Sequence, residues 1–272
     1  MKIGKRYKIN ESQREKQTRY FDHKALTELE VTRPRGLGNL YRFLMDYKMH
    51  KMAGLVGQSL RGKNVLNVCC GPGMEAEYFA DLGARVSALD ISLGALKGGR
   101  IRSKRFGFEL RSLVADAENL PFRPESFDFV FTHDGLHHLP HPEKGIAEMV
   151  RVAKTGIFFT EPADAFITRL AVRLGFSANY EESGNLVRRL SVCRLKTLFG
   201  QLGLNSSRFL RYGMWYSHYP PKWFLLFENE LLFGSFKAFF YLGNSMFGRF
   251  GNKLVAVAWK DQSWNKNCSA RS

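Results

Sequence analysis

The sequence has few cysteines and no long apolar run. Its four cysteines, Cys69, Cys70, Cys193 and Cys268, form no Cys-x-x-Cys pair and no metal-ligand spacing. We therefore expect free thiols in a reducing cytoplasm and no metal site. No apolar stretch approaches the roughly 20 residues that a membrane-spanning helix needs. The N-terminal residues are basic and lack the apolar centre of a signal peptide, so we expect a cytoplasmic protein.

Charge of one sign dominates the chain. Its 272 residues include 41 Lys and Arg against 25 Asp and Glu, a formal net charge of +16. This balance favours an acidic partner, either nucleic acid or an anionic membrane surface, although a basic proteome background would also explain it. The hydrophobic fraction of 44% is enough for the core of one elaborated α/β domain.

Composition divides the chain into four parts. We expect residues 1–19 to be a basic flexible tail and residues 20–62 a helical cap, because apolar side chains between Gly36 and Leu60 follow helical spacing. Residues 63–261 would form the main domain, and residues 262–272 a polar tail.

Strands alternate with helices through the first part of the main domain. We predict strands at residues 64–69, 85–89, 108–115, 127–133, 156–160 and 252–260. We predict helices at residues 74–82, 92–105, 142–152, 166–174 and 193–204. Such alternation predicts an α/β fold with a doubly wound, mainly parallel, Rossmann-like sheet. We expect seven strands, of which the pattern locates six.

A glycine-rich turn follows the first predicted strand, within the stretch NVLNVCCGPGMEAEYFADLGARVSALD. Gly71-x-Gly73-x-x-Ala76 satisfies the relaxed dinucleotide fingerprint, and Asp90 ends the second strand. Glycines let a ligand approach the backbone, and the acid can accept hydrogen bonds from two ribose hydroxyls. Both a dinucleotide and S-adenosylmethionine need these features, so the motif alone leaves both cofactors open.

The next stretch, VADAENLPFRPESFDFVFTHDGLHHLPHP, decides between the two cofactors. Asp116 ends the third strand, where its carboxylate can accept from an adenine amino group while the Ala117 amide donates to the ring. Three runs closely resemble the class I S-adenosylmethionine-dependent methyltransferases, nearest to the type 11 branch that includes quinone-biosynthesis enzymes: Glu118–Phe122, Ser126–Asp128 and Leu136–His138.

The resemblance spans about Asn64 to Pro162 and implies roles for individual residues. The turn residues would face the methionine moiety and ribose of the cofactor, Asp90 would hold the ribose hydroxyls, and Asp116 would read the adenine. The expected cofactor-binding residues are Asn67, Cys69, Cys70, Gly71, Gly73, Asp90, Ile91, Asp116, Ala117 and His133.

Two positions depart from the family pattern. Asn67 stands where the family usually has an acid, and an amide carries no charge for the ammonium group of the cofactor. Cys69 stands where a glycine is usual, so a Cβ occupies a place of close backbone approach. Lower cofactor affinity, or an inactive member of the family, is the alternative that these residues raise.

Methyl transfer from a sulfonium depends mainly on aligning the acceptor and excluding water. A base is needed only when the acceptor must lose a proton. His133, His137 and His138 are the candidate catalytic residues, although adjacent histidines at the start of a helix often serve as caps or packing groups. Weaker candidates, which we interpret as solvated loop residues, are Glu161, Tyr180 and Glu181.

An insertion at about residues 220–250, before the last strand, is unusually rich in aromatic side chains. Its charged residues are too frequent for a spanning helix. It is either a pair of core helices that cover the sheet or form a homodimer interface, or a lipid-facing or substrate-enclosing lid. The four consecutive apolar residues Phe239–Leu242 predict a helix that is apolar all round, and Gly234, Gly243, Gly248 and Gly251 favour a mobile lid.

The sequence therefore predicts a methyltransferase that uses S-adenosylmethionine on a small, hydrophobic or lipid- or glycan-linked acceptor, with peripheral contact to an anionic membrane. An RNA methyltransferase using a basic helix at Lys97–Arg111 is one alternative. We disfavour nucleic acid because the basic stretches lack interleaved aromatic residues for base stacking. A non-catalytic cofactor-binding homologue is the other alternative.

Overall fold

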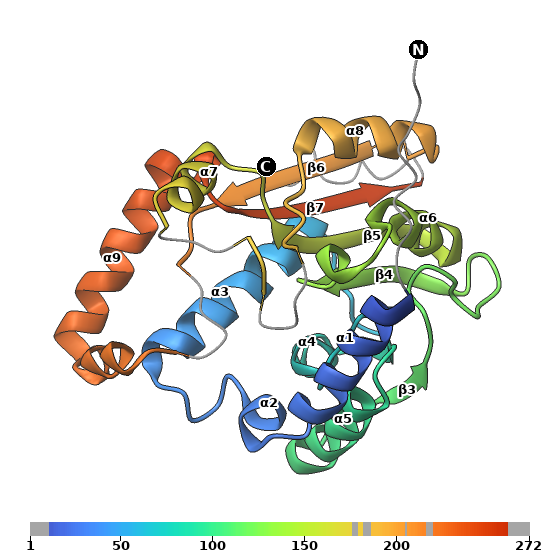
Figure 1. The fold of residues 1–272 in the computed structure, drawn as a ribbon, viewed down its shortest axis with the longest axis horizontal. Coiled ribbons are helices and arrows are strands. Elements are labelled where there is room, and N and C mark those ends of the chain that lie inside the picture. Colours follow the sequence, from blue (N-terminus) through green and yellow to red (C-terminus); the bar gives the residue numbers. More distant parts are fainter. Residues whose placement is uncertain (1–10, 176–178, 182–185, 205, 216–219, 261–272) are drawn as a thin grey trace.

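A seven-stranded sheet forms the centre of the molecule (Figure 1). The computed structural model describes residues 11–175, 179–181, 186–204, 206–215 and 220–260. The strands are β1 (Asn64–Val68), β2 (Arg85–Asp90), β3 (Arg111–Val114), β4 (Phe127–His133), β5 (Ala153–Pro162), β6 (Ser206–Tyr212) and β7 (Lys253–Trp259). Their order is β3-β2-β1-β4-β5-β7-β6, with β1 to β5 parallel and β7 antiparallel to both of its neighbours. The predicted fold class is confirmed.

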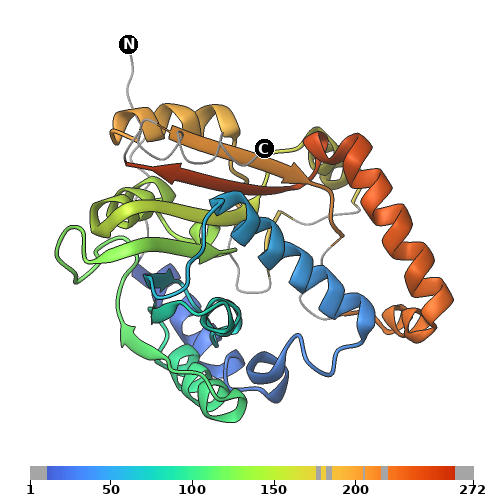
Figure 2. The same cartoon turned by 180° about the vertical axis from the view of Figure 1, so that it is seen from behind.

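Helices cover both faces of this sheet (Figure 2). They are α1 (Glu11–Lys24), α2 (Glu28–Thr32), α3 (Asn39–Val56), α4 (Met74–Asp81), α5 (Leu93–Phe106), α6 (Pro142–Val152), α7 (Phe166–Arg173), α8 (Val192–Gln201) and α9 (Glu230–Phe247). Three short 3₁₀ segments complete the described elements: η1 (Leu136–His138), η2 (Lys222–Glu228) and η3 (Gly248–Phe250).

Strand periodicity divides the core into two layers. Along β4, Phe129 and Phe131 join the buried cluster under α3 and α4, while Val130 joins the cluster under α6 and α8. Alternate side chains of a strand point to opposite faces, so a strand covered on both sides must be apolar throughout. β7 is buried at every position and apolar at all of them except Lys253, and it lies between β5 and the edge strand β6.

The strand that the sequence pattern did not locate is β6. It lies at the edge of the sheet, pairs only with β7 among the described strands, and carries Arg208 and Arg211. Edge strands tolerate such charged residues because one side of the ladder is unpaired. The two arginines therefore obscured this strand in the sequence, and its pairing with β7 identifies it in the structure.

The expectation of a flexible tail over residues 1–19 is wrong for its second half. Residues 11–24 form α1, while residues 1–10 and the expected polar tail at 262–272 lie outside the described part of the chain. The Asp22 carboxylate Oδ1 accepts hydrogen bonds from Ser92 Oγ at 2.6 Å and from the Gly94 amide at 2.7 Å. These bonds fix α1 to the N-terminus of α5, so the helical cap begins earlier than predicted.

The basic helix predicted after Ser92 is α5, and Ser92 caps it as expected by accepting from the Ala95 amide. Arg102 is buried instead of solvated: its Nε donates to Glu77 at 2.6 Å, and a second nitrogen donates to the Val31 carbonyl at 2.9 Å. Part of the basic charge that suggested an acidic partner is therefore used inside the fold.

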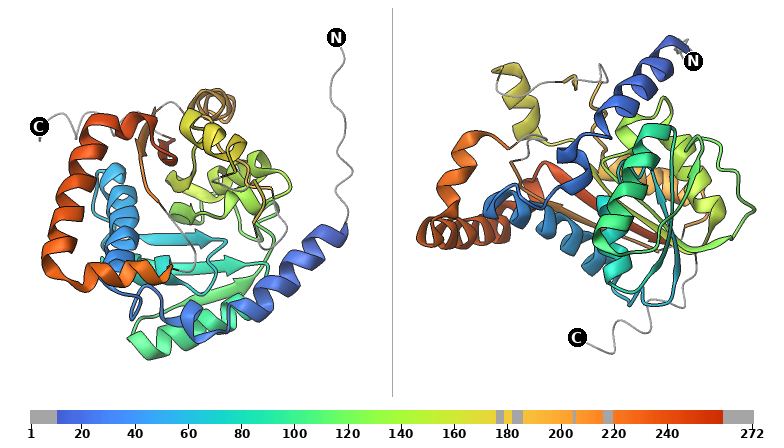
Figure 3. Two further views of the ribbon diagram at one scale, coloured as in Figure 1. Left: turned by 60° about the vertical axis from the view of Figure 1, so that its left-hand side comes forward. Right: turned by 90° about the horizontal axis from the view of Figure 1, so that it is seen from below.

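The aromatic insertion forms one long helix, α9, between η2 and η3. Figures 1 and 3 show α9 on the outside of the molecule beside α3. Gly234 and Gly243 lie inside this continuous helix and do not divide it, contrary to the punctuated segment that we expected. None of the described helices is both long enough and apolar enough to span a bilayer.

Candidate active site

A cavity of about 1360 Å³ opens at the carboxyl ends of the parallel strands. It lies where the strand order reverses between β1 and β4, which is the usual ligand position in doubly wound sheets. All the predicted cofactor-binding residues line this cavity except Asn67 and Gly73. Asn67 is fully buried within β1, and the Oδ1 of its side chain has no hydrogen-bond partner among the described residues.

The turn after β1 brings backbone to the cavity wall. Cys69, Gly71 and Gly73 all have positive φ angles, of 53°, 49° and 81°. A Cβ at Gly71 would meet no protein atom within 4 Å, so the space in front of this residue is open. Cys69 holds a left-handed conformation that non-glycine residues seldom adopt. Its side chain packs against Gly135, where an added Cβ would come within 2.6 Å of the Cys69 Cβ.

The two predicted acids at the ends of β2 and β3 are fixed by backbone amides. The Gly71 amide donates to one oxygen of Asp90 and the Ser92 amide to the other, each at 2.9 Å. Burial raises the pKa of Asp90, while these two amides act in the opposite direction. Asp116 accepts from the Glu118 amide at 2.9 Å. Both carboxylates are thus held in place at the cavity before any ligand arrives.

His133, at the end of β4, has a hydrogen-bonded carboxylate on one side and a second carboxylate farther away on the other, because Asp134 Oδ2 lies 3.5 Å from its Nε2. Its Nδ1 lies 2.5 Å from Glu75 Oε1, and its buried Nε2 has no hydrogen-bond partner among the described residues. Burial lowers the pKa of His133, and the nearby Lys48 charge adds to this effect, against the pull of Glu75. A neutral ring that donates from Nδ1 leaves Nε2 as an acceptor.

His137, in η1, is held on both sides. Its Nδ1 lies 2.6 Å from Glu161 Oε2, and its Nε2 lies 3.1 Å from Glu181 Oε1. Burial opposes charge on this ring, but the two carboxylates dominate and raise the pKa of His137 to about 10. His137 is therefore an imidazolium that donates from both nitrogens at neutral pH.

Glu161 is the anchor of the loop that carries these histidines. It is fully buried at the end of β5, so our interpretation of it as a solvated loop residue is wrong. Besides His137, it accepts from the amides of Gly135 at 2.8 Å and Leu136 at 2.7 Å. One carboxylate thus satisfies two buried amides and one imidazolium.

His138 is partly exposed and lies against its neighbours. Its Nδ1 is 3.4 Å from Glu181 Oε2, and its ring lies edge-on to Phe21 of α1. Ligand atoms of His137, His138 and Glu181 lie within 4.8 Å of one another, a spacing that could hold a metal ion. A metal would first have to displace the proton that His137 shares with its carboxylates.

Sequence reasoning missed the ion cluster behind the loop. Asp134, which also has a positive φ, lies 2.5 Å from Lys48 Nζ and 2.8 Å from Lys253 Nζ. These two lysines hold the pKa of Asp134 well below its ordinary value, although burial opposes them. Lys48 comes from α3 and Lys253 from β7, so only the folded chain brings them together.

The lining of the cavity differs between its regions. Near Asp90 it is lined by Tyr20, Phe21 and Lys24 of α1, none of which the sequence had identified as a site residue. Elsewhere its lining includes apolar side chains of α7, of Trp215 and of the insertion, together with the charged residues Asp164, Arg169 and Arg211. The apolar side chains are Phe166, Ile167, Trp215, Phe247 and Phe250.

The fold and the cavity define a class. A doubly wound sheet with an antiparallel β7, a glycine turn after β1 and an acid after each of β2 and β3 is the class I methyltransferase arrangement that the sequence suggested. Among solved structures, magnesium protoporphyrin IX methyltransferase from Synechocystis, crystallised with S-adenosylhomocysteine, has this fold. It aligns over 90% of this chain and all of its own, with a TM-score of 0.59 and 15% identity.

Sequence relatives agree with the fold. Residues 66–160 match the family model described as a methyltransferase domain, which confirms the resemblance seen in the sequence. Demethylmenaquinone methyltransferase from Renibacterium salmoninarum is 44% identical over 95 residues, which are 35% of this chain and 38% of that protein. Phthiotriol/phenolphthiotriol dimycocerosates methyltransferase from Mycobacterium tuberculosis is 38% identical over 102 residues, 37% of each. The matched stretch is thus less than half the length of these relatives.

Proposed function

We propose that this protein is an S-adenosylmethionine-dependent methyltransferase. The observation that carries the proposal is the cavity at the β1–β4 switch point, with Asp90 and Asp116 both fixed on its wall beside the open face of Gly71. When bound there, S-adenosylmethionine supplies an electrophilic methyl group. Asp90 would accept from the ribose hydroxyls, and Asp116 with the Ala117 amide would select adenine.

The residues present fit this cofactor. The Cβ of Cys69, which the sequence raised as an obstacle, packs toward Gly135, and Gly71 leaves the backbone open. Asn67 does not reach the wall, so we assign it no contact with the cofactor. Its missing charge is therefore a smaller handicap than the sequence alone suggested.

We propose a small hydrophobic or lipid-linked acceptor. The lining of the cavity includes the apolar side chains Phe166, Ile167 and Phe250, and burying apolar surface against them would hold such an acceptor beside the sulfonium. The named relatives are enzymes for a demethylmenaquinone and for phthiotriol dimycocerosates, which supports a lipid-like acceptor for this chain.

We assign His133 as the group that accepts a proton if the acceptor is a hydroxyl, because it lines the cavity and its lowered pKa keeps the ring neutral at neutral pH. Its neutral ring has an Nε2 without a hydrogen-bond partner among the described residues, and Glu75 would stabilise the imidazolium that forms. His137 is a poor base because both of its nitrogens already carry protons. It would instead position the loop from Asp134 to His138.

Peripheral contact with an anionic membrane is the second part of the proposal. The outer face of α9 comprises Leu231, Leu232, Phe239, Leu242 and Met246, and Leu231 is 83% exposed and Phe239 77%. On α7, Phe166 lines the cavity and is 73% exposed. Exposed Lys222 and Arg249 adjoin the insertion, and apolar with basic side chains suits an anionic bilayer.

Calorimetric titration tests the cofactor assignment. S-adenosylmethionine should bind to the wild-type protein and NAD should not, because the Asp116–Ala117 adenine site is not a requirement of dinucleotide folds. Binding of NAD without any S-adenosylmethionine heat would end the proposal. Asp81→Ala, an exposed acid at the end of α4, serves as a control for Asp90→Ala.

A further inference from the structure

Two histidines of the candidate site differ in how closely a second carboxylate approaches them. His137 lies between two carboxylates, each at hydrogen-bond distance from one ring nitrogen, and its pKa is raised to about 10. His133 has Glu75 at its Nδ1, but its Nε2 lies 3.5 Å from Asp134 Oδ2, which is beyond the usual range of an N–H···O hydrogen bond. The second carboxylate of His133 is therefore close to the ring without being bonded to it.

The oxygen that faces His133 is already held by Lys48. Lys48 Nζ lies 2.5 Å from Asp134 Oδ2, the same atom that lies 3.5 Å from His133 Nε2. Lys253 Nζ lies 2.8 Å from Oδ1 and 2.9 Å from Oδ2 of this carboxylate. Lys48 is fully buried, so water screens its charge little. The two ammonium groups thus satisfy Asp134, and Lys48 competes with His133 for one of its oxygens.

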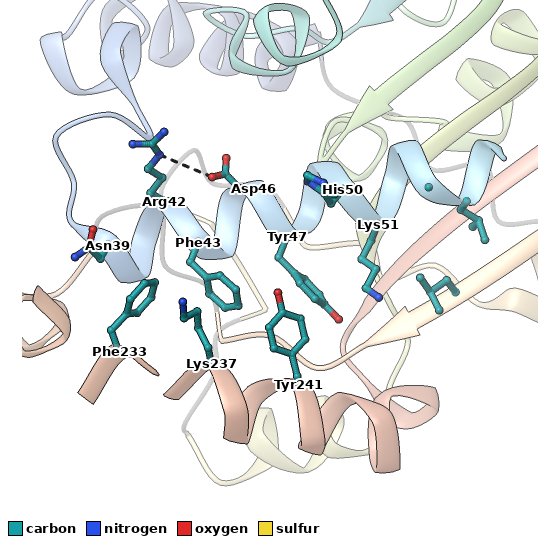
Figure 4. A pocket seen from close by; sticks show the side chains of 13 residues that line it. Asn39, Arg42, Phe43, Asp46, Tyr47, His50, Lys51, Phe233, Lys237 and Tyr241 are labelled. Carbon is teal, nitrogen blue, oxygen red and sulfur yellow. Dashed lines mark ion pairs between the residues drawn. The ribbon is translucent and has the colours of Figure 1, made fainter. Parts of the chain in front are cut away.

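The two lysines of α3 lie on different sides of this helix. Figure 4 shows Phe43, Tyr47 and Lys51 on the side that faces α9. Lys51 Nζ lies 5.0 Å from the centroid of the Tyr47 ring. Lys48 instead reaches Asp134, which follows β4 at the active-site cavity. The charge of Lys48, and not that of Lys51, is therefore directed at the candidate base.

We propose that Lys48 is a positioning residue that keeps the Nε2 atom of His133 available to accept a proton from the methyl acceptor. By holding Asp134 Oδ2, Lys48 prevents this carboxylate from binding an Nε2–H group. Such a bond would fix His133 as an imidazolium held on both sides, as His137 is. The inference rests on the proposed role of His133 as the base, and it adds to that role a residue that does not line the cavity.

Charged side chains from several elements surround His133. They act on the ring directly or through its two carboxylates, and they are Glu75, Asp134, Lys48, Lys253, Arg33 and His137. Burial lowers the pKa of His133, and the charge of Lys48 lowers it further, against the pull of the two carboxylates. Removing the Lys48 charge takes away this repulsion and leaves Asp134 with one ammonium group instead of two. Both changes favour the protonated ring.

Nuclear magnetic resonance of the histidine side chains tests this role without the methyl acceptor. The signal of His133 is assigned by its absence from the spectrum of His133→Gln, and it is titrated in each variant. In Lys48→Met the pKa of His133 should rise by about 1–3 pH units, the usual effect of a nearby charge. Lys48→Arg keeps the charge and should retain the wild-type value. Lys51→Met removes the same charge from the other side of α3 and should also leave the pKa unchanged.

Two results would overturn the proposal: an unchanged pKa of His133 in Lys48→Met, or an equal rise in Lys51→Met, which would show a general charge effect. Lys48→Gln can still hydrogen-bond to Asp134, so it supplies a second neutral variant if Lys48→Met does not fold, and it too should raise the pKa.

Activity and cofactor binding complete the test. In the neutral variants the rising limb of kcat/KM should move to higher pH together with the pKa of His133, whereas a purely structural role would lower kcat/KM without moving the profile. Failure of the wild-type protein to bind S-adenosylmethionine in calorimetry would count against the proposed function. A fixed pKa of His133 in variants that still bind S-adenosylmethionine would count against the role of Lys48 alone.

Discussion

Residues 66–160 and the helices around them differ in how they use their surfaces. In the first region the polar groups face a cavity and are held by protein partners, as Asp90 is by two amides and His133 by Glu75. In α7 and α9 no residue is buried, and large apolar side chains face outward. The family model matches residues 66–160, the first region. This contrast supports the proposal that the first region binds the cofactor and that the second contacts the acceptor and a membrane surface.

The largest expected effect is on catalysis and comes from His133, in the first region. For a hydroxyl acceptor, His133→Gln should lower kcat/KM by about 10²–10⁴, the usual contribution of a general base. Because the pKa of His133 is lowered, wild-type kcat/KM should rise with pH below 6.5 and then stay level. A variant with the wild-type rate and profile would contradict the assignment of His133 as the base.

Stability should depend most on Glu161. Glu161→Ala leaves the His137 imidazolium and two buried amides without their acceptor, and should lower the free energy of unfolding by about 3–5 kcal/mol. Urea denaturation measures this loss. Glu109→Ala, at an exposed position, should change stability by less than about 0.5 kcal/mol. Similar small losses for the two variants would rule out Glu161 as an anchor.

The same contact should make stability depend on pH. The pKa of His137 is raised from 6.5 to about 10, so folding favours its protonated form. The resulting stabilisation is complete below pH 6.5 and is lost as the pH rises toward 10. Unfolding of His137→Gln between pH 6.5 and 10 should vary less with pH than unfolding of the wild type; parallel curves would refute the ion pair.

A smaller effect is expected on liposome binding, and it should differ between the outward and inward faces of α9. Phe239→Asp, on the exposed face, should weaken binding to anionic liposomes by about 1.5–3 kcal/mol without unfolding the protein. Phe240, the next residue, packs against Phe43 and Tyr47, so Phe240→Asp should destabilise the packing of α9 on α3. A wild-type protein that ignores liposomes would leave the outer face to a second subunit.

The smallest expected loss concerns the cofactor. Asp90→Ala should weaken S-adenosylmethionine binding by about 1–3 kcal/mol, because the ribose hydroxyls lose a charged acceptor. Calorimetry on Asp90→Ala and on the Asp81→Ala control gives the difference. An affinity equal to that of the control would remove Asp90 from the ribose site.

The sequence pattern predicted the elements whose burial leaves a local apolar pattern. The strands β1, β2, β4, β5 and β7 were found because strands covered on both faces are mostly apolar. The edge strand β6 was hidden by its arginines. The first part of α1 was missed because the helix is held by hydrogen bonds that Asp22 accepts from Ser92 and Gly94, and such bonds leave no apolar stripe in the sequence.

The site was predictable to the same extent. Asp90, Asp116 and the turn residues follow strand ends directly, so the motif identified them. Three residues from three different elements contact His133 or Asp134, and only the tertiary fold brings them there: Glu75, Lys48 and Lys253. The distinction between His133 and His137 likewise depends on buried carboxylates that are distant in the sequence.

One measurement tests the central claim most directly. The protein is incubated with methyl-labelled S-adenosylmethionine and a total extract from its own cells, and the label is followed by mass spectrometry. We predict label in an organic-soluble compound, at a lower rate with Asp90→Ala at limiting cofactor. Label in RNA, or no transfer by a protein that binds NAD in place of S-adenosylmethionine, would contradict the account.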